Sequence, residues 1–267
     1  MRLFVFDVDG TLISRGNTKL KPQLIDKLNE ILSNGDVIAI ASGRPYSGIM
    51  KILSQINDGK KFCLCANGTQ VTDIEGNSLY FCGLTLKDYL TFCKVHENIL
   101  KHRSSNIYCY TSDKIAYLKN NFWIKFEKEA NNFDGINLKK EKLAEDYPIL
   151  KFMIASGSRR SKSFDEKQIS EEEKIKYHIV RTSPYFLEFI NKNSDKAEGV
   201  RFLKEYLKIQ DENVYTFGDS GNDLLMIKNF NGIAMGNAIK ECKDVAKFIT
   251  KDVDDDGVIY AIDNFVK

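Results

Sequence analysis

Both ends of the chain alternate short, continuously apolar runs with helical patterns, and this alternation restricts the possible folds more than any other feature. Near the start, the runs Leu3 to Phe6 and Val37 to Ala41 are each followed by an amphipathic pattern, which opens at Pro22 and at Pro45. A run that is apolar at every position is expected for a strand covered on both faces. The alternation therefore predicts the α/β class, with a mostly parallel, Rossmann-like sheet and helices on both faces.

The pattern returns near the other end of the chain, where helical stripes precede the apolar runs Val214 to Phe217 and Gly232 to Met235. The middle of the chain is different, because it mixes helical segments with the strand-like runs Asn106 to Tyr110, Ile149 to Ala155 and Tyr185 to Ile190. A capping-box spacing from Ser170 to Glu173 predicts a helix start there. We therefore predict a discontinuous domain of residues 1–81 and 191–267, with an α+β domain, residues 82–190, inserted into it.

The composition bounds the class of protein. A length of 267 residues favours two domains over one. A hydrophobic content of 43% with 28% charged residues is typical of globular proteins, and a formal net charge of +2 points to no nucleic-acid partner. With no apolar run of about 20 residues and no signal-peptide pattern, we expect a cytoplasmic protein without a membrane partner. The six cysteines and three histidines show no metal-ligand spacing, and the oligomeric state is not indicated.

The first strand runs directly into two carboxylates, Asp7 and Asp9. Burying unpaired carboxylates together is costly, so a cation is expected beside them. The carboxyl ends of parallel strands meet at one edge of the sheet, where ligands bind. Other residues that follow strands at this edge, or lie just before a helix there, are Ser42, Gly43, Asn67, Lys196, Asp219 and Asp223. Converging carboxylates with few nitrogen or sulfur ligands favour Mg²⁺.

Four of these segments occur in a characteristic order: Asp7-Val-Asp-Gly-Thr11, Ser42-Gly-Arg44, Lys196 and Gly218-Asp-Ser-Gly-Asn-Asp223. The order resembles the four motifs of the haloacid dehalogenase superfamily, and most of all its Cof-type sugar-phosphatase branch, which inserts an α+β cap between the second and third motifs. Ala66-Asn-Gly68 and Ala234-Met-Gly-Asn237 are similar to further short signatures of that branch. The third motif differs, because Gly199 stands three residues after the lysine, where many relatives have glycine directly after it.

This resemblance implies a Mg²⁺-dependent phosphatase that hydrolyses small phosphorylated metabolites, with sugar phosphates as the expected substrates. Asp7 would be the nucleophile that forms an aspartyl-phosphate, and Asp9 the general acid and base. Ser42 and Lys196 would hold the transferring phosphoryl group. The expected metal-binding residues are Asp7, Asp9, Asp219 and Asp223. The expected substrate-binding residues are Val8, Gly10, Gly43, Arg44, Asn67 and Asn222.

Other interpretations stay open at this stage. A phosphomutase of the same superfamily, or a non-catalytic ligand-binding regulator, are the alternative functions. The same residue types also have ordinary structural roles, since aspartate and serine cap helices, Asp-Gly and Asn-Gly form turns, and Lys196 could be one exposed charge among several. The basic run that contains Arg159, Arg160 and Lys162 is interpreted as a solvated loop of the inserted domain.

Overall fold

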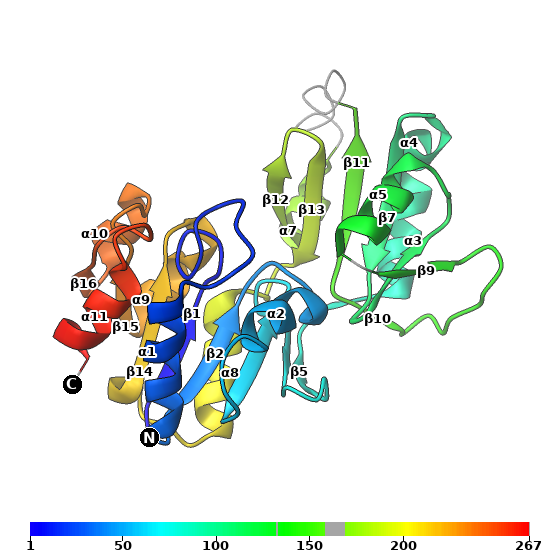
Figure 1. Cartoon of the computed structure of the whole chain (residues 1–267). Coiled ribbons are helices and arrows are strands. Elements are labelled where there is room, and N and C mark those ends of the chain that lie inside the picture. The colour runs from blue at the N-terminus through cyan, green and yellow to red at the C-terminus, as the bar shows by residue number, and fades with distance from the viewer. Residues whose placement is uncertain (132, 158–168, 267) are drawn as a thin grey trace. The chain divides into compact units, whose positions relative to one another are not determined.

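The computed structural model describes residues 1–131, 133–157 and 169–266, so the basic run with Arg159, Arg160 and Lys162 lies outside the described residues. The chain divides into two compact units (Figure 1): unit 1 comprises residues 1–81 and 195–267, and unit 2 comprises residues 82–194. The second boundary comes later than the predicted 190/191, because a strand of unit 2 continues to Asn191 and the next helix begins at Lys196.

Unit 1 is built on an eight-stranded sheet in the order β16-β15-β14-β1-β2-β3-β4-β5. The strands from β16 to β3 are parallel, and β4 and β5 extend the sheet antiparallel. The strands are β1 (Leu3–Phe6), β2 (Val37–Ala41), β3 (Lys61–Cys65), β4 (Gln70–Thr72), β5 (Ser78–Phe81), β14 (Val214–Gly218), β15 (Asn231–Ala234) and β16 (Phe248–Ile249). The helices are α1 (Pro22–Ser33), α2 (Tyr46–Leu53), α8 (Lys196–Tyr206), α9 (Leu224–Asn229), α10 (Lys240–Val245) and α11 (Gly257–Phe265), with short 3-10 turns at η1 (Asp211–Asn213) and η2 (Gly221–Asp223).

Helices cover both faces of this sheet, which explains why its central strands are apolar at every position. Alternate residues of β1 point to opposite faces. Phe4 and Phe6 pack in a cluster with α1, α2 and α11, whereas Leu3 and Val5 pack in a second cluster with α8. Figure 1 shows α1 and α8 on opposite sides of these strands. The α/β class predicted from the continuous apolar runs is confirmed.

Unit 2 contains a six-stranded sheet in the order β12-β13-β11-β7-β8-β9, which is antiparallel except for the β8–β9 pair, and a two-stranded sheet of β10 and β6. Its strands are β6 (Leu84–Thr85), β7 (Ser105–Tyr110), β8 (Lys114–Tyr117), β9 (Asp134–Asn137), β10 (Pro148–Ile149), β11 (Lys151–Ser156), β12 (Tyr177–Ser183) and β13 (Phe186–Asn191). Its described helices are α3 (Leu86–Val95), α4 (Glu97–Lys101), α5 (Phe122–Asn131) and α7 (Glu171–Lys176).

Two details of unit 2 test the sequence patterns. The capping box is present: the Ser170 hydroxyl accepts from the Glu173 N–H, the Glu173 carboxylate accepts from the Ser170 N–H, and α7 begins at Glu171. The single strand predicted over Ile149 to Ala155 is wrong. The chain changes partner at Leu150, so that β10 pairs with β6 while β11 joins the six-stranded sheet.

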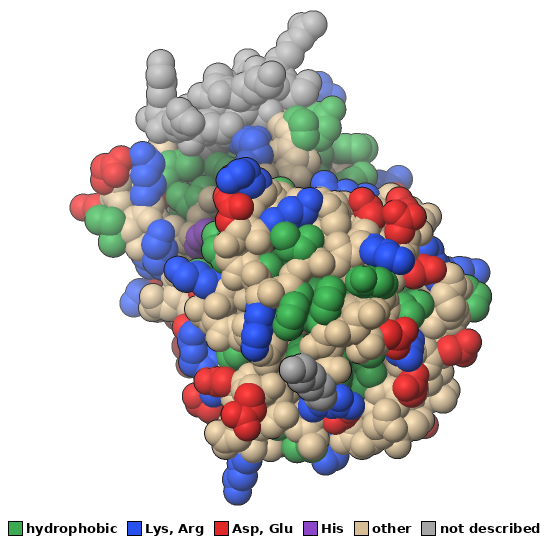
Figure 2. Space-filling view, turned by 90° about the vertical axis from the view of Figure 1, so that its left-hand side faces the viewer, with side chains coloured by type: hydrophobic (Ala, Val, Ile, Leu, Met, Phe, Trp, Pro, Cys, Tyr) green, Lys and Arg blue, Asp and Glu red, His purple; other side chains and the backbone are tan. Residues whose placement is uncertain are grey.

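The face shown in Figure 2 carries both basic and acidic side chains, interspersed with polar and apolar ones. Within the described ranges, every helix is too short or too polar to cross a bilayer.

One glycine allows the segment after β3 to approach α8 closely. Gly68 has a φ of +84°, and a Cβ atom on it would lie 2.1 Å from the carbonyl oxygen of Asp195, the residue before α8. Any side chain at this position would force the two segments apart. The absence of a side chain at Gly68 therefore lets the first residue of α8, Lys196, lie against the end of β3.

We expect Gly68→Ala to destabilise unit 1 more than Gly16→Ala does, as measured by urea unfolding. Both glycines have left-handed backbone (φ +84° and +91°), but a Cβ on Gly16 would meet no atom within 4 Å. Gly16→Ala should therefore cost only the conformational penalty of about 1–2 kcal/mol, whereas Gly68→Ala adds the steric clash and should cost more than about 3 kcal/mol. Equal losses would show that α8 moves away from the loop at no cost.

Candidate active site

Loops at the carboxyl ends of the parallel strands bring the predicted residues to one edge of the unit 1 sheet. Asp7 follows β1, Ser42 follows β2, Asn67 follows β3 and Asp219 follows β14. The backbone joins these loops, since the Asp7 N–H donates to the Phe217 carbonyl at 3.0 Å and the Asn67 N–H donates to the Ser42 carbonyl at 2.8 Å. The sheet therefore positions these side chains relative to one another.

A buried lysine connects two carboxylates at this edge. Lys196, only 1% exposed, is the first residue of α8 rather than a residue before it, as the sequence had indicated. Its Nζ lies 2.6 Å from Asp7 Oδ1 and 2.6 Å from Asp223 Oδ1. Although burial alone lowers the pKa of Lys196, the Asp223 and Asp7 carboxylates raise it above its ordinary value. Lys196 therefore carries a fixed positive charge, and the alternative of an exposed surface lysine is excluded.

Asp223 is fully buried and is fully occupied with hydrogen bonds. Besides the Lys196 contact, its Oδ2 accepts from the Asp219 N–H at 3.0 Å and from the Ser220 N–H at 2.9 Å. These bonds include a capping box with Ser220 at η2, so the capping role considered for Asp223 is real. A carboxylate held on both oxygens is suited to fixing Asp219 and Lys196 in place.

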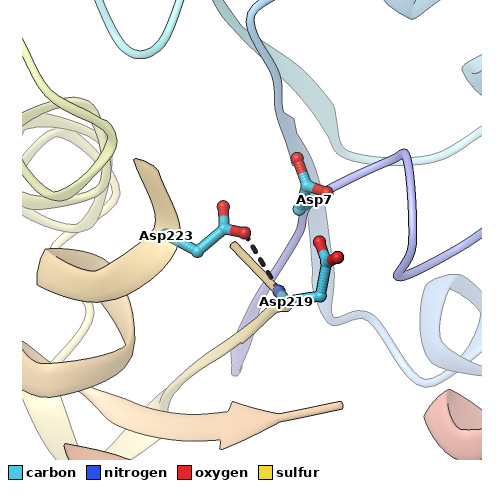
Figure 3. A group of neighbouring side chains, drawn as sticks. All are labelled: Asp7, Asp219 and Asp223. Carbon is cyan, nitrogen blue, oxygen red and sulfur yellow. Dashed lines mark hydrogen bonds between the residues drawn. The ribbon is translucent and has the colours of Figure 1, made fainter. Parts of the chain in front are cut away.

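A carboxylate oxygen of Asp219 gives the strongest indication of a cation-binding site. Its Oδ1 is buried and has no hydrogen-bond partner among the described residues. Figure 3 shows the Asp7 and Asp219 carboxylates next to each other, with Asp223 pointing toward them. Each of the three residues offers an oxygen within 4.8 Å of the others. Three buried carboxylates face one buried ammonium, and the largely exposed guanidinium of Arg15 reaches only Asp219 Oδ2, at 3.4 Å, so the cluster has an excess of negative charge that a hard divalent cation would match.

The pKa values show that, without such a cation, ionisation of these carboxylates is unfavourable. Burial raises the pKa of Asp7 to about 7, and repulsion from Asp223 adds to the rise, while Lys196 opposes it. Burial and Asp223 likewise raise the pKa of Asp219 to about 6, although the Arg15 guanidinium opposes the rise. A divalent cation between these carboxylates would favour their charged forms, and a charged Asp7 is the form that can act as a nucleophile.

Asp9 and Arg44 form a contact that the sequence did not predict. The Arg44 guanidinium donates to both carboxylate oxygens of Asp9, from Nε at 3.1 Å and from Nη2 at 2.7 Å. Arg44, which was expected at the substrate, contacts the side chain proposed as general acid. Asp9 is 42% exposed, unlike Asp7, so its carboxylate lies at the solvent side of the cluster.

The loops after β2 and β3 form the other side of the edge. Ser42 is buried, and its hydroxyl accepts from the Arg44 N–H at 3.3 Å. Asn67 lies over Gly43, where an added Cβ would come within 3.4 Å of its carboxamide, and its Oδ1 accepts from Asn222 Nδ2 at 2.9 Å. Asn67 and Asn222 were both expected to bind substrate, and the structure pairs them across two loops.

The turn after Asp7 differs from the prediction at one amide. The Gly10 N–H, expected at a phosphoryl oxygen, donates to the Ile13 carbonyl at 2.7 Å, and the Val8 carbonyl accepts from the following turn. A further contact, not predicted from the sequence, is made by Arg15, whose Nη2 lies 3.4 Å from Asp219 Oδ2. No pattern pointed to Arg15, because a single arginine in a polar loop has no spacing signal.

The raised pKa values predict that the folded state becomes less stable as Asp7 and Asp219 lose their protons. Because the folded pKa of Asp7 exceeds the unfolded value of 3.8, the folded protein binds more protons than the unfolded chain up to about pH 7. The contribution of Asp7 to stability is therefore lost as pH rises toward 7, and Asp219 acts in the same direction. In EDTA at pH 8, Asp7→Asn keeps an oxygen that can accept from Lys196 and removes the repelled charge, so it should raise the Tm by a few degrees, and the gain should shrink toward pH 4. A lower Tm at pH 8 would contradict this account.

Comparison with known proteins gives the same assignment as the motifs. Residues 4–262 match the family model described as haloacid dehalogenase-like hydrolase. YxeH of Bacillus subtilis, named as a phosphatase, is 28% identical, with 99% of this chain and 98% of that protein covered. The 5-amino-6-(5-phospho-D-ribitylamino)uracil phosphatase YwtE of B. subtilis is 25% identical, with 100% and 98% covered. A haloacid dehalogenase-like hydrolase from Bacteroides thetaiotaomicron shares the fold at a TM-score of 0.81, with 27% identity and 98% of each chain covered. The chain belongs to the haloacid dehalogenase-like hydrolases.

Proposed function

We propose that this protein is a Mg²⁺-dependent phosphatase that hydrolyses small phosphorylated metabolites in the cytoplasm through an aspartyl-phosphate on Asp7. The observation that carries the proposal is the buried cluster in which Lys196 holds Asp7 while Asp219 leaves an oxygen unpaired. Relatives that span the whole chain are named as phosphatases, which supports the reaction class. Sugar phosphates are the substrate class that we would test first.

The chemistry follows from the charges at the site. An Asp7 oxygen attacks phosphorus, the ester P–O bond breaks, and Asp9 gives a proton to the departing oxygen. Water then attacks the phosphorus of the aspartyl-phosphate while Asp9 takes its proton, which releases phosphate and restores Asp7. For Asp9 to reach the leaving group in these steps, its contact with Arg44 has to loosen.

The remaining residues bind and orient. Lys196 holds Asp7 and balances the charge of the phosphoryl oxygens, with Ser42 and the amides of Val8 and Gly43 as further donors. Mg²⁺, when bound by Asp7, Asp219 and the Asp9 carbonyl, would neutralise charge on the phosphoryl group. Asp223 would orient these ligands rather than replace one of them.

Substrate selection is assigned to unit 2. All the residues proposed for phosphoryl transfer belong to unit 1, so unit 2 remains as the domain whose loops would choose the leaving group. A panel of phosphorylated metabolites, assayed for phosphate release with Mg²⁺ and with EDTA, tests the whole proposal. Absence of Mg²⁺-dependent release from every compound, in a folded preparation, would reject it.

Asp7→Asn should lower kcat by on the order of 10³-fold or more, because the amide keeps the size of the side chain but cannot attack phosphorus. The measurement is phosphate release under saturating substrate, with circular dichroism to verify the fold. Activity close to that of the wild type would exclude Asp7 as the nucleophile.

Asp219→Ala and Asp223→Ala should separate metal binding from stability. Asp219→Ala removes a ligand, so Mg²⁺ affinity should fall by more than the roughly 10–100-fold typical of a residue that only orients a ligand. Asp223→Ala leaves Lys196 without one of its two partners, so it should reduce the free energy of unfolding by about 3–5 kcal/mol. Calorimetric Mg²⁺ titration and urea unfolding of both variants would reveal a misassignment if the two effects were reversed.

A further inference from the structure

One side chain ties the turn between β15 and α10 to the loop that follows β1. Asn237 Nδ2 donates to the Gly10 carbonyl oxygen at 2.8 Å, and Asn237 Oδ1 accepts from the Val253 N–H at 3.0 Å. Both ends of the carboxamide are therefore used. Asn237 thereby connects three segments that lie far apart in the sequence, although no role was assigned to it from its motif.

The same turn also holds Asp219. The Ile239 N–H, two residues after Asn237, donates to the Asp219 carbonyl at 2.9 Å. Gly10, the other partner of the turn, lies directly against the Asp219 side chain: a Cβ on Gly10 would be 2.4 Å from Asp219 Oδ2. A single turn thus restrains both the backbone of Asp219 and the peptide that packs against its carboxylate.

We propose that Asn237 is a positioning residue for the divalent-cation site and acts through the Gly10 peptide. This inference rests on the proposed function, in which Asp7, Asp219 and the Asp9 carbonyl hold the cation. The Asp9 carbonyl lies in the peptide unit directly before Gly10, and the carbonyl that Asn237 holds lies in the next unit, so the two units share the Gly10 Cα. The hydrogen bond from Asn237 therefore restrains one proposed ligand by the backbone and a second, Asp219, by direct packing. Residues that orient metal ligands in this way affect metal affinity strongly.

The effect should appear in cation affinity rather than in stability. Asn237 is an exposed residue whose bond to Val253 is exposed and whose bond to Gly10 is partly buried, and such bonds contribute little to folding because water replaces them readily. A matched control lies at the opposite end of β15. Asn231 is buried, and its Nδ2 donates to the carbonyls of Asp211, Glu212 and Val214, far from the carboxyl edge of the sheet.

The experiment is a calorimetric titration of the metal-free, full-length protein with Mg²⁺ at pH 8, with the Tm of each variant measured in EDTA. Asn237→Ala should weaken Mg²⁺ binding about 10-fold with little change in Tm. Asn231→Ala should lower the Tm but leave the Mg²⁺ affinity within about twofold of the wild type, as expected for a residue that is only structural.

A second variant distinguishes the positioning effect of Asn237 from the effect of negative charge near the cation site. Asn237→Asp keeps the acceptor for Val253 but replaces the donor to Gly10 with an oxygen that repels it, so positioning predicts weaker Mg²⁺ binding. Added negative charge alone would predict tighter binding. Wild-type affinity in Asn237→Ala, tighter binding in Asn237→Asp, or equal losses in Asn237→Ala and Asn231→Ala would each overturn the inference. A wild-type protein that binds no Mg²⁺ would instead reject the proposed cation site itself.

Discussion

The ammonium group of Lys196, buried between Asp7 and Asp223, is the contact on which the arrangement of the site depends. An ion pair removed from water is stable only when its geometry is good and each charge has its partners. Here the three charges come from the end of β1, the start of α8 and the turn after β14, and Lys196 lies 189 residues from Asp7 and 27 residues from Asp223 in the sequence. The pair therefore requires the strands to be in register and α8 to be seated against the sheet.

The same cluster has an excess of negative charge, which would favour the binding of a cation. Lys196 and the exposed Arg15 do not fully compensate three buried carboxylates, and burial together with repulsion from Asp223 raises the pKa values of Asp7 and Asp219. The raised pKa values mean that ionising this concentrated negative site in the absence of a cation opposes folding. A site of this kind gains most from a divalent ion, because binding removes the repulsion as well as adding ligand bonds.

Sequence patterns predicted the elements whose physics is local and repetitive. The central strands were visible because both faces are buried, and the strand-end residues were visible because parallel strands place their carboxyl ends together. The exchange of partners at Leu150, and the contacts of Arg44 with Asp9 and of Arg15 with Asp219, were not visible. These depend on loop geometry and on the rotamers of long side chains, which no spacing rule encodes.

In the third motif, the position of α8 that has least room for a side chain is not the one directly after Lys196. The position directly after Lys196 is occupied by Ala197, which is buried against the sheet, so a small side chain fits there. The position with less room is Gly199, where a Cβ would lie 3.0 Å from the Leu64 side chain and 3.2 Å from the Cα of Gly68, closer than an ordinary contact. Two glycines on facing segments therefore let α8 approach β3 closely enough to bury the charge of Lys196. Burial of Lys196 requires this close approach of α8 to β3, and the approach is possible without a glycine directly after the lysine.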